Sequence, residues 1–269
     1  MSDATIVSRK ADPAGRCPVL FVHGAWHGSW CWAEHFLDRF ADAGHDAYAI
    51  DLRFHGDGTP PGPRPDLRRV TIGDYLSDIH RALAALPRTT VLVGHSMGGY
   101  LVQRYLARRR GGPGVLLAPV PHRGVAAASI RIGARHPAAL AKATATWSMW
   151  PIVEDRARAA RLLFDPDMPD DLAGRYLDRL QDESYTAYLG MFVPVRTRLV
   201  RSPMLVIGGS EDAIFTTGEV AATARAYGTE PLIVDGAGHD LMLGARWETV
   251  AEEILRWLAG PEHDPCRER

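Results

Sequence analysis

The chain has 269 residues, of which 46% are hydrophobic and 23% charged, and its 31 Lys and Arg against 32 Asp and Glu leave a formal net charge of −1. A chain of this size buries roughly 75% of its extended surface on folding, which is enough to form one large core. The balanced charge argues against a general nucleic-acid partner, which would require a basic excess. No apolar stretch approaches the ~20 residues of a membrane span. The N-terminus lacks the apolar region of a signal peptide, so we expect a cytoplasmic protein.

Short apolar runs bounded by Gly, Pro or Asp predict six buried strands. In chain order these are Pro18–Val22, Asp46–Leu52, Thr89–Val93, Val115–Val120, Met204–Gly208 and Pro231–Asp235. Longer segments with apolar positions three and four residues apart predict helices between them. These helices are Trp32–Ala43, Ile72–Leu86, Tyr100–Arg109, Glu219–Tyr227 and Arg246–Leu258. The alternation predicts a doubly wound α/β fold with a mostly parallel sheet.

Residues 121–195 interrupt this alternation. They show no strand pattern, only Ala- and Arg-rich helical stretches separated by prolines. The segment is too long to be an ordinary loop in a compact domain. We therefore expect an α/β core formed by residues 1–120 and 196–269. Residues 121–195 form a helical cap inserted after the fourth recognisable strand.

The sequence Gly94-His95-Ser96-Met97-Gly98 matches the G-x-S-x-G pattern of a nucleophile elbow. An apolar strand precedes it and a predicted helix follows it, which is the context that the motif requires. The sharp turn lifts the serine hydroxyl above the sheet, where the N-terminus of the helix favours negative charge. A glycine-rich turn without chemistry is the alternative, but the context favours Ser96 as a nucleophile.

A serine nucleophile needs a base, and the base needs a carboxylate to orient it. Asp212 follows the fifth predicted strand, and His239 follows the sixth. Because active sites of open α/β sheets lie at the carboxyl ends of the strands, these side chains and Ser96 are expected to converge. Glu211 lies in the same loop as Asp212 and is a competing acid.

Acyl transfer also requires hydrogen-bond donors for the oxyanion that develops in the transition state. The backbone N–H groups of Ala25, in the first strand–helix loop, and Met97, directly after the nucleophile, are the expected pair. Trp26 borders this loop and is a candidate pocket residue. Aromatic residues and methionines of the expected cap are suited to an apolar chamber, or they join the cap to the core. They are Trp147, Met149, Trp150, Phe164, Tyr185, Tyr188, Met191 and Phe192, of which Trp147 and Trp150 are the candidate substrate contacts.

Four sequence blocks resemble the α/β-hydrolase superfamily in order and spacing, over essentially the whole chain. The blocks are HGAWHGSWCW at residues 23–32, GHSMGG at 94–99, GGSED at 208–212 and GHD at 238–240. The first block resembles plant methylesterases and hydroxynitrile lyases, and the rest resembles small bacterial esterases. The resemblance implies Ser96 as nucleophile, Asp212 as acid and His239 as base. It also implies Ala25 and Met97 as oxyanion donors and residues 121–195 as the cap over the pocket.

Two departures from relatives within the superfamily narrow the expected reaction. The lyases have a lysine directly after the catalytic histidine, where this chain has Asp240, which argues against cyanohydrin cleavage. Dehalogenases and epoxide hydrolases have an aspartate at the elbow, where this chain has Ser96. We therefore predict a serine hydrolase, with no cofactor and no metal, that cleaves a small or medium-sized apolar carboxylic ester or thioester through an acyl-enzyme on Ser96.

Two alternatives stay open at this point. The same three residues would also serve a lyase, elimination, acyl-transfer or perhydrolase reaction, because one fold hosts many functions. A non-catalytic receptor for a small molecule is the other alternative. The complete set of nucleophile, acid and base argues against it, because a receptor has no need of all three.

Overall fold

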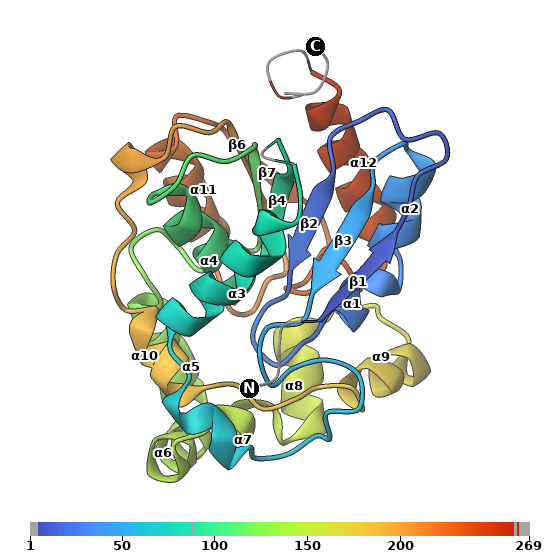
Figure 1. Cartoon of the computed structure of the whole chain (residues 1–269). Helices are drawn as coiled ribbons and strands as arrows, with labels where there is room; N and C mark the ends of the chain where they lie inside the picture. Colours follow the sequence, from blue (N-terminus) through green and yellow to red (C-terminus); the bar gives the residue numbers. More distant parts are fainter. Residues whose placement is uncertain (1–4, 88, 261–262, 264–269) are drawn as a thin grey trace.

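A seven-stranded sheet forms the centre of the molecule (Figure 1). The computed structural model describes residues 5–87, 89–260 and 263, and its strands lie in the order β1-β3-β2-β4-β5-β6-β7. Their bounds are Ile6–Arg9 (β1), Val19–Val22 (β2), Ala47–Ile50 (β3), Val91–His95 (β4), Gly114–Leu117 (β5), Met204–Gly209 (β6) and Pro231–Val234 (β7). Every neighbouring pair is parallel except β1 and β3, which are antiparallel. The predicted doubly wound, mostly parallel α/β fold is confirmed.

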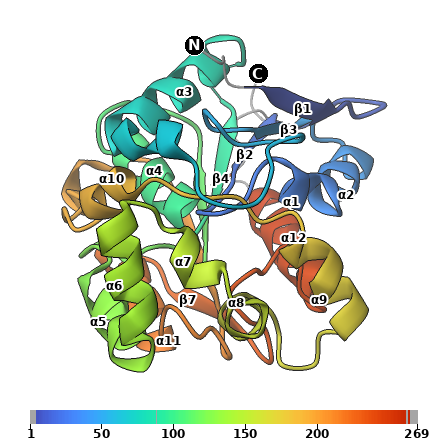
Figure 2. The ribbon, with the colours of Figure 1, turned by 90° about the horizontal axis from the view of Figure 1, so that it is seen from below.

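Helices cover both faces of the sheet, which is why every residue of β2, β4 and β5 is buried. Helices α3 and α4 pack on one face, and α2 and α12 on the other (Figure 2). Their bounds, with those of α1 and α11, are Trp30–Ala33 (α1), Phe36–Asp42 (α2), Ile72–Ala84 (α3), Met97–Leu106 (α4), Thr217–Ala226 (α11) and Trp247–Leu258 (α12). Within the described residues, no helix has both the length and the hydrophobicity to cross a bilayer.

The N-terminal part of the fold differs from the prediction in two places. Strand β1 was not expected, because it is a short, largely exposed edge strand with no continuous apolar run. The first predicted helix is divided into α1 and α2, because His35 leaves helical geometry at φ −141°. Both halves still pack their aromatic side chains on β2: the ring of Phe21 lies 4.9 Å from that of Trp32 and 5.1 Å from that of Phe40. The division therefore leaves the core packing intact.

Six α-helices lie between β5 and β6. They are Ala126–Arg135 (α5), Pro137–Thr146 (α6), Trp150–Val153 (α7), Arg156–Leu163 (α8), Asp170–Leu177 (α9) and Tyr185–Gly190 (α10). Residues 121–195, all of them described, contain no strand and only one isolated bridge, between Ser148 and Ser184. Short 3₁₀ helices lie outside residues 121–195, at Pro65–Arg69 and at Thr197–Leu199, just before β6. Helices α5–α10 gather at one end of the sheet (Figure 1); the exact boundaries of a cap domain stay a prediction.

Candidate active site

Ser96 occupies the sharp turn between the end of β4 and the start of α4. Its backbone is in the left-handed region, at φ 50° and ψ −114°, a conformation that costs a non-glycine residue about 1–3 kcal/mol. Two glycines make the turn possible. A Cβ atom on Gly94 would lie 2.4 Å from the carbonyl oxygen of Gly98, and one on Gly98 would lie 2.2 Å from that of Val22. The motif therefore requires glycine at both positions because backbone segments approach each other there.

The loops after β6 and β7 bring Asp212 and His239 together. Oδ2 of Asp212 lies 2.9 Å from Nδ1 of His239, and both side chains are at most 1% exposed. Oδ1 of Asp212 accepts hydrogen bonds from the backbone N–H groups of Ile214 (2.8 Å) and Phe215 (3.0 Å). The carboxylate is thus fixed by three contacts, and it in turn fixes the orientation of the imidazole.

The protonation of His239 is set by opposing effects. Burial lowers its pKa, but the Asp212 carboxylate, which is both a nearby negative charge and a hydrogen-bond partner, together with the charge of Asp240, outweighs burial and raises the pKa above its ordinary value. A raised pKa makes the ring a better proton acceptor, which suits a general base.

Three other carboxylates lie close to His239 in the sequence or in its neighbouring loop. Glu211 and Asp235 are exposed. Asp240 is fully buried, but its carboxylate contacts His27, at 3.0 Å. Of these four acids, it is Asp212 that contacts the His239 ring.

His95, the residue before Ser96, contacts the histidine loop, which is the loop between β7 and α12 (residues 235–246) that carries His239. Its Nε2 lies 3.1 Å from the carbonyl oxygen of His239, and the centroids of the two rings are 4.8 Å apart. The Ser96 hydroxyl forms no hydrogen bond with any other described residue. Proton transfer from Ser96 to His239 therefore belongs to the proposal made below.

The two expected oxyanion donors lie in the wall of the same cavity as Ser96. Neither the Ala25 nor the Met97 backbone N–H donates to a protein acceptor within the described part of the chain. Both donors are thus available to a bound carbonyl oxygen.

His23 fixes the direction of the Ala25 N–H. Its Nε2 accepts a hydrogen bond from the backbone N–H of Leu52 (3.1 Å), so the ring proton is on Nδ1, 2.8 Å from the carbonyl oxygen of Gly24. Burial, with a smaller effect of His55, lowers the pKa of His23 well below its ordinary value, so the ring is neutral. The Gly24 carbonyl and the Ala25 N–H belong to one planar peptide unit. Because His23 fixes the orientation of the Gly24 carbonyl group, it also fixes the direction of the Ala25 N–H.

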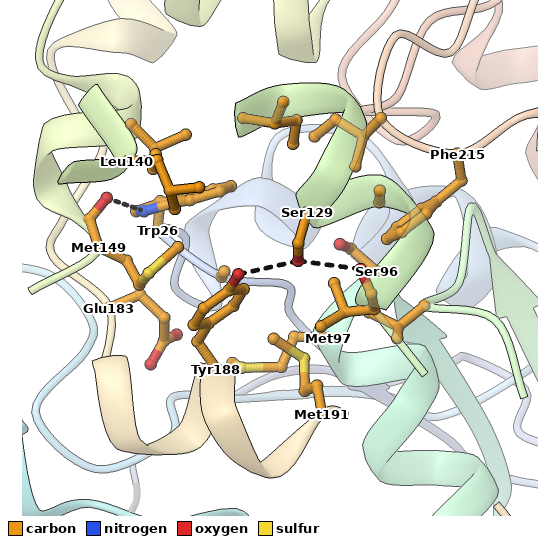
Figure 3. Close-up of a pocket in the computed structure, with 17 residues that line it drawn as sticks. Trp26, Ser96, Met97, Ser129, Leu140, Met149, Glu183, Tyr188, Met191 and Phe215 are labelled. Carbon is orange, nitrogen blue, oxygen red and sulfur yellow. Dashed lines mark hydrogen bonds between the residues drawn. The ribbon is translucent and has the colours of Figure 1, made fainter. Parts of the chain in front are cut away.

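An apolar cavity adjoins Ser96 (Figure 3). Strand-end loops supply one part of its wall, and residues 121–195 supply most of the rest. Its apolar side chains from that segment include Val125, Ile132, Leu140, Met149, Ile152 and Met191. A buried apolar chamber of this kind accommodates an apolar ligand.

Trp26 joins the two parts of the wall. Its backbone is in the left-handed region, at φ 66°, and its indole lines the cavity. The indole Nε1–H donates to the carbonyl oxygen of Met149 at 3.2 Å (Figure 3). The backbone carbonyl oxygen of Trp26 accepts a hydrogen bond from the backbone N–H of Gln181 at 2.8 Å.

The structure differs from the prediction for two tryptophans. Trp147 is 42% exposed and its indole donates to Thr186 at 3.2 Å. It caps α6 in the left-handed conformation, at φ 55°, where the chain changes direction before α7. Trp150 is partly buried, and neither tryptophan lines the cavity. Of the other residues expected there, Met149, Tyr188 and Met191 do line it.

Two residues of the wall, Ser129 and Phe215, were not expected from the sequence. Tyr188 Oη donates to Ser129 Oγ (2.8 Å), which donates to the Val125 carbonyl oxygen (2.9 Å) (Figure 3). Phe215 enters from the loop after Asp212. Ser129 lies on a helix face and Phe215 in a loop, and neither position carries a periodic pattern that marks a pocket.

Three buried side chains near the elbow place potential metal-ligand atoms within 4.8 Å of one another: His95, His239 and Asp240. Two of these side chains also contact other protein groups. His95 Nε2 faces the His239 carbonyl oxygen, and Asp240 contacts His27. One nitrogen of His95 and one carboxylate oxygen of Asp240 take part in these contacts.

Comparison with known proteins decides the family. Residues 19–253 match the model of the Alpha/beta hydrolase family. The chain belongs to this family. This α/β hydrolase is 38% identical over 85 residues to norfluorocurarine synthase 2 of Strychnos sp., and 37% identical over 82 residues to methylesterase 18 of Arabidopsis thaliana.

The sequence matches to these plant relatives are partial. They cover 31% and 30% of this chain and 30% and 29% of the respective relatives. An esterase structure from Exiguobacterium antarcticum superposes over 96% of both chains, with a TM-score of 0.74 and 14% identity. At that identity the superposition supports the fold alone, and it agrees with the sheet described above.

Proposed function

We propose that this α/β hydrolase is a serine hydrolase that cleaves a small or medium-sized apolar carboxylic ester or thioester. The observation that carries the proposal is the 2.9 Å contact between Asp212 and His239. Its support is the apolar cavity nearby, whose wall contains Ser96, Ala25 and Met97.

In the proposed mechanism, the Ser96 oxygen attacks the carbonyl carbon while Nε2 of His239 takes the hydroxyl proton. Asp212 stabilises the resulting imidazolium, and the N–H groups of Ala25 and Met97 stabilise the oxyanion. The C–O or C–S bond then breaks, and the alcohol or thiol leaves with the proton from His239. Water then attacks the acyl-enzyme and gives a proton to His239. As the ester bond to Ser96 breaks, His239 returns this proton to the Ser96 oxygen and the carboxylic acid leaves.

The substrate class follows from the cavity wall. Apolar side chains of residues 121–195 would surround the acyl group or the leaving group. The described residues of the wall include one carboxylate, Glu183, and no Lys or Arg, so an anionic substrate would lose its hydration there without compensation. Methylesterase 18, to which part of the chain is similar, is named for ester cleavage. These observations favour an uncharged, apolar ester.

Other chemistry on the same three residues is less well supported. A cyanohydrin lyase would need a cation beside the substrate, and the described residues that line the cavity include no Lys or Arg. Asp240, at the position after His239, is directed to His27 and does not line the cavity. One relative is named a synthase, so elimination, acyl-transfer and perhydrolysis assays accompany the hydrolysis test.

The test is labelling with a fluorophosphonate, followed by peptide mapping. We expect a single label on Ser96 and turnover within a panel of p-nitrophenyl esters and thioesters of increasing acyl length. A label on another residue would remove the nucleophile assignment. Folded protein that takes no label, turns over no ester and still binds a ligand tightly would support the receptor alternative.

A further inference from the structure

Asp240 is a buried acid for which the proposed mechanism gives no role. It directly follows His239, is 0% exposed and does not line the cavity. Its Oδ2 lies 3.0 Å from Nε2 of His27, and its Oδ1 lies 3.6 Å from Nε2 of His95. A carboxylate buried this deeply is costly unless it is paired. Oδ2 is paired with His27, whereas Oδ1 forms no hydrogen bond with any described residue.

His27 connects this carboxylate to the backbone of the oxyanion loop, which is the loop between β2 and α1 (residues 23–29) that carries Ala25. The ring is 1% exposed and stacks on Trp30, with centroids 5.3 Å apart. Its Nε2 faces Asp240, and its Nδ1 lies 2.8 Å from the carbonyl oxygen of Ala25. Both ring nitrogens thus face oxygen acceptors, and the ring bridges a carboxylate on the histidine loop to the backbone of the oxyanion loop.

His95, in the nucleophile elbow, also lies next to Asp240. Burial, together with the neighbouring His239, lowers the pKa of His95 to about 3, so its ring is neutral. Its Nε2 faces the carbonyl oxygen of His239. The oxyanion loop, the elbow and the histidine loop therefore meet around Asp240.

We propose that Asp240 and His27 are a positioning pair that fixes the oxyanion loop against the histidine loop. The pair keeps the Ala25 N–H directed at a carbonyl bound beside Ser96. This inference rests on the function proposed above. The pair acts through the backbone, without touching substrate, and it adds to the hold that His23 has on the preceding peptide unit. An apolar pair would fill the same space but would not set the direction of the loop.

The test compares Asp240→Asn, His27→Gln and the double variant in steady-state kinetics. Misalignment of a catalytic group by about 1 Å costs on the order of 100-fold in rate. We expect each single variant to lower kcat by about 10- to 100-fold, with KM nearly unchanged. The double variant should be no slower than the slower single variant, because both substitutions break the same link. Asp235→Asn, which changes an exposed acid at the end of β7, is the matched control and should keep wild-type kcat.

Two outcomes would overturn the proposal: single variants that fold and keep kcat within about two-fold of wild type, or losses that multiply in the double variant. If Asp240→Asn fails to fold, His27→Gln still decides. Its amide retains a donor for Asp240 but cannot also reach the Ala25 carbonyl. Unchanged kcat in that variant would contradict the pair's role.

NMR separates failure of this inference from failure of the proposed function. Wild-type protein without ester turnover and without a label on Ser96 would refute the function. The pair would then be judged by solvent exchange of the His27 ring protons. Slow exchange in the wild type and fast exchange in Asp240→Asn would support the pair; fast exchange in both would overturn it.

Discussion

The strand-end loops and residues 121–195 build opposite parts of one cavity in different ways. The loops hold Ser96, Asp212 and His239 in place by strained backbone and short hydrogen bonds, such as the 2.9 Å contact between the last two. The helical segment contributes mainly apolar side chains, whose contacts have no preferred direction. A substitution in the loops should therefore change the alignment of groups, whereas one in the helices should change the shape of the cavity.

The largest expected effect tests the loop side of this comparison. Ser96→Ala should lower kcat on ester substrates by about 10⁶-fold, the size of the loss when a protease nucleophile is removed. The fold should persist, because only one hydroxyl is deleted and the backbone strain at φ 50° stays tolerable for alanine in this turn. Steady-state kinetics would measure kcat, and thermal unfolding would measure the stability of the fold. Ser202→Ala, far along the chain from the elbow, is the control. Retained turnover in Ser96→Ala would place the nucleophile elsewhere.

The acid provides a second test of alignment. Asp212→Asn should lower kcat by up to about 10⁴-fold, because the amide favours the wrong tautomer of His239 and cannot stabilise its imidazolium. The control is Glu211→Gln, which alters the exposed neighbour in the same loop and should cost far less. The opposite ranking of these two variants would show that the acid has been misassigned.

The helical side should respond through substrate choice. Leu140 lines the cavity, so Leu140→Ala should enlarge it. A methylene group in a hydrophobic pocket changes the specificity for a substrate by about 10- to 200-fold. We expect the ratio of kcat/KM for a long-chain ester to that for an acetyl ester to change by about ten-fold or more. Trp147→Ala, outside the cavity and 42% exposed, is the control. Equal losses on every ester would indicate damaged folding instead of a changed cavity.

The smallest expected effect is a shift in pH dependence. Because the charges of Asp212 and Asp240 outweigh burial and raise the pKa of His239, and the base must be unprotonated, kcat/KM should fall as pH decreases through a value above 6.5. Asp240→Asn should move this inflection to lower pH, since a charge that favours the imidazolium is removed. A pH–rate profile of both proteins checks the sign. An inflection that moves upward would contradict this electrostatic account.

The central strands and the order of the candidate site residues could be predicted because they depend on local patterns. A strand covered on both faces reads as a continuous apolar run, as β2 and β4 do. The contact between Asp212 and His239 follows from their places after neighbouring parallel strands. Strand β1 carries no such run, because it is an exposed edge.

The cavity wall and the buried network depend on contacts that composition does not reveal. Trp147 has the side chain of a pocket residue, but the end of α6 places it at the surface. The partners His27 and Asp240 are 213 positions apart, and neither belongs to a periodic pattern. Only the assembled loops bring them together.

The two hydrogen bonds of Trp26 limit how the cavity can admit a ligand. The tryptophan follows Ala25 directly, and its indole and carbonyl groups are tied to Met149 and to Gln181. If residues 121–195 swung away as a rigid lid, both bonds would break and the backbone next to an oxyanion donor would be released. Wide opening would therefore remove two of the contacts that hold the backbone beside Ala25. A ligand that passes between individual side chains would leave both contacts intact.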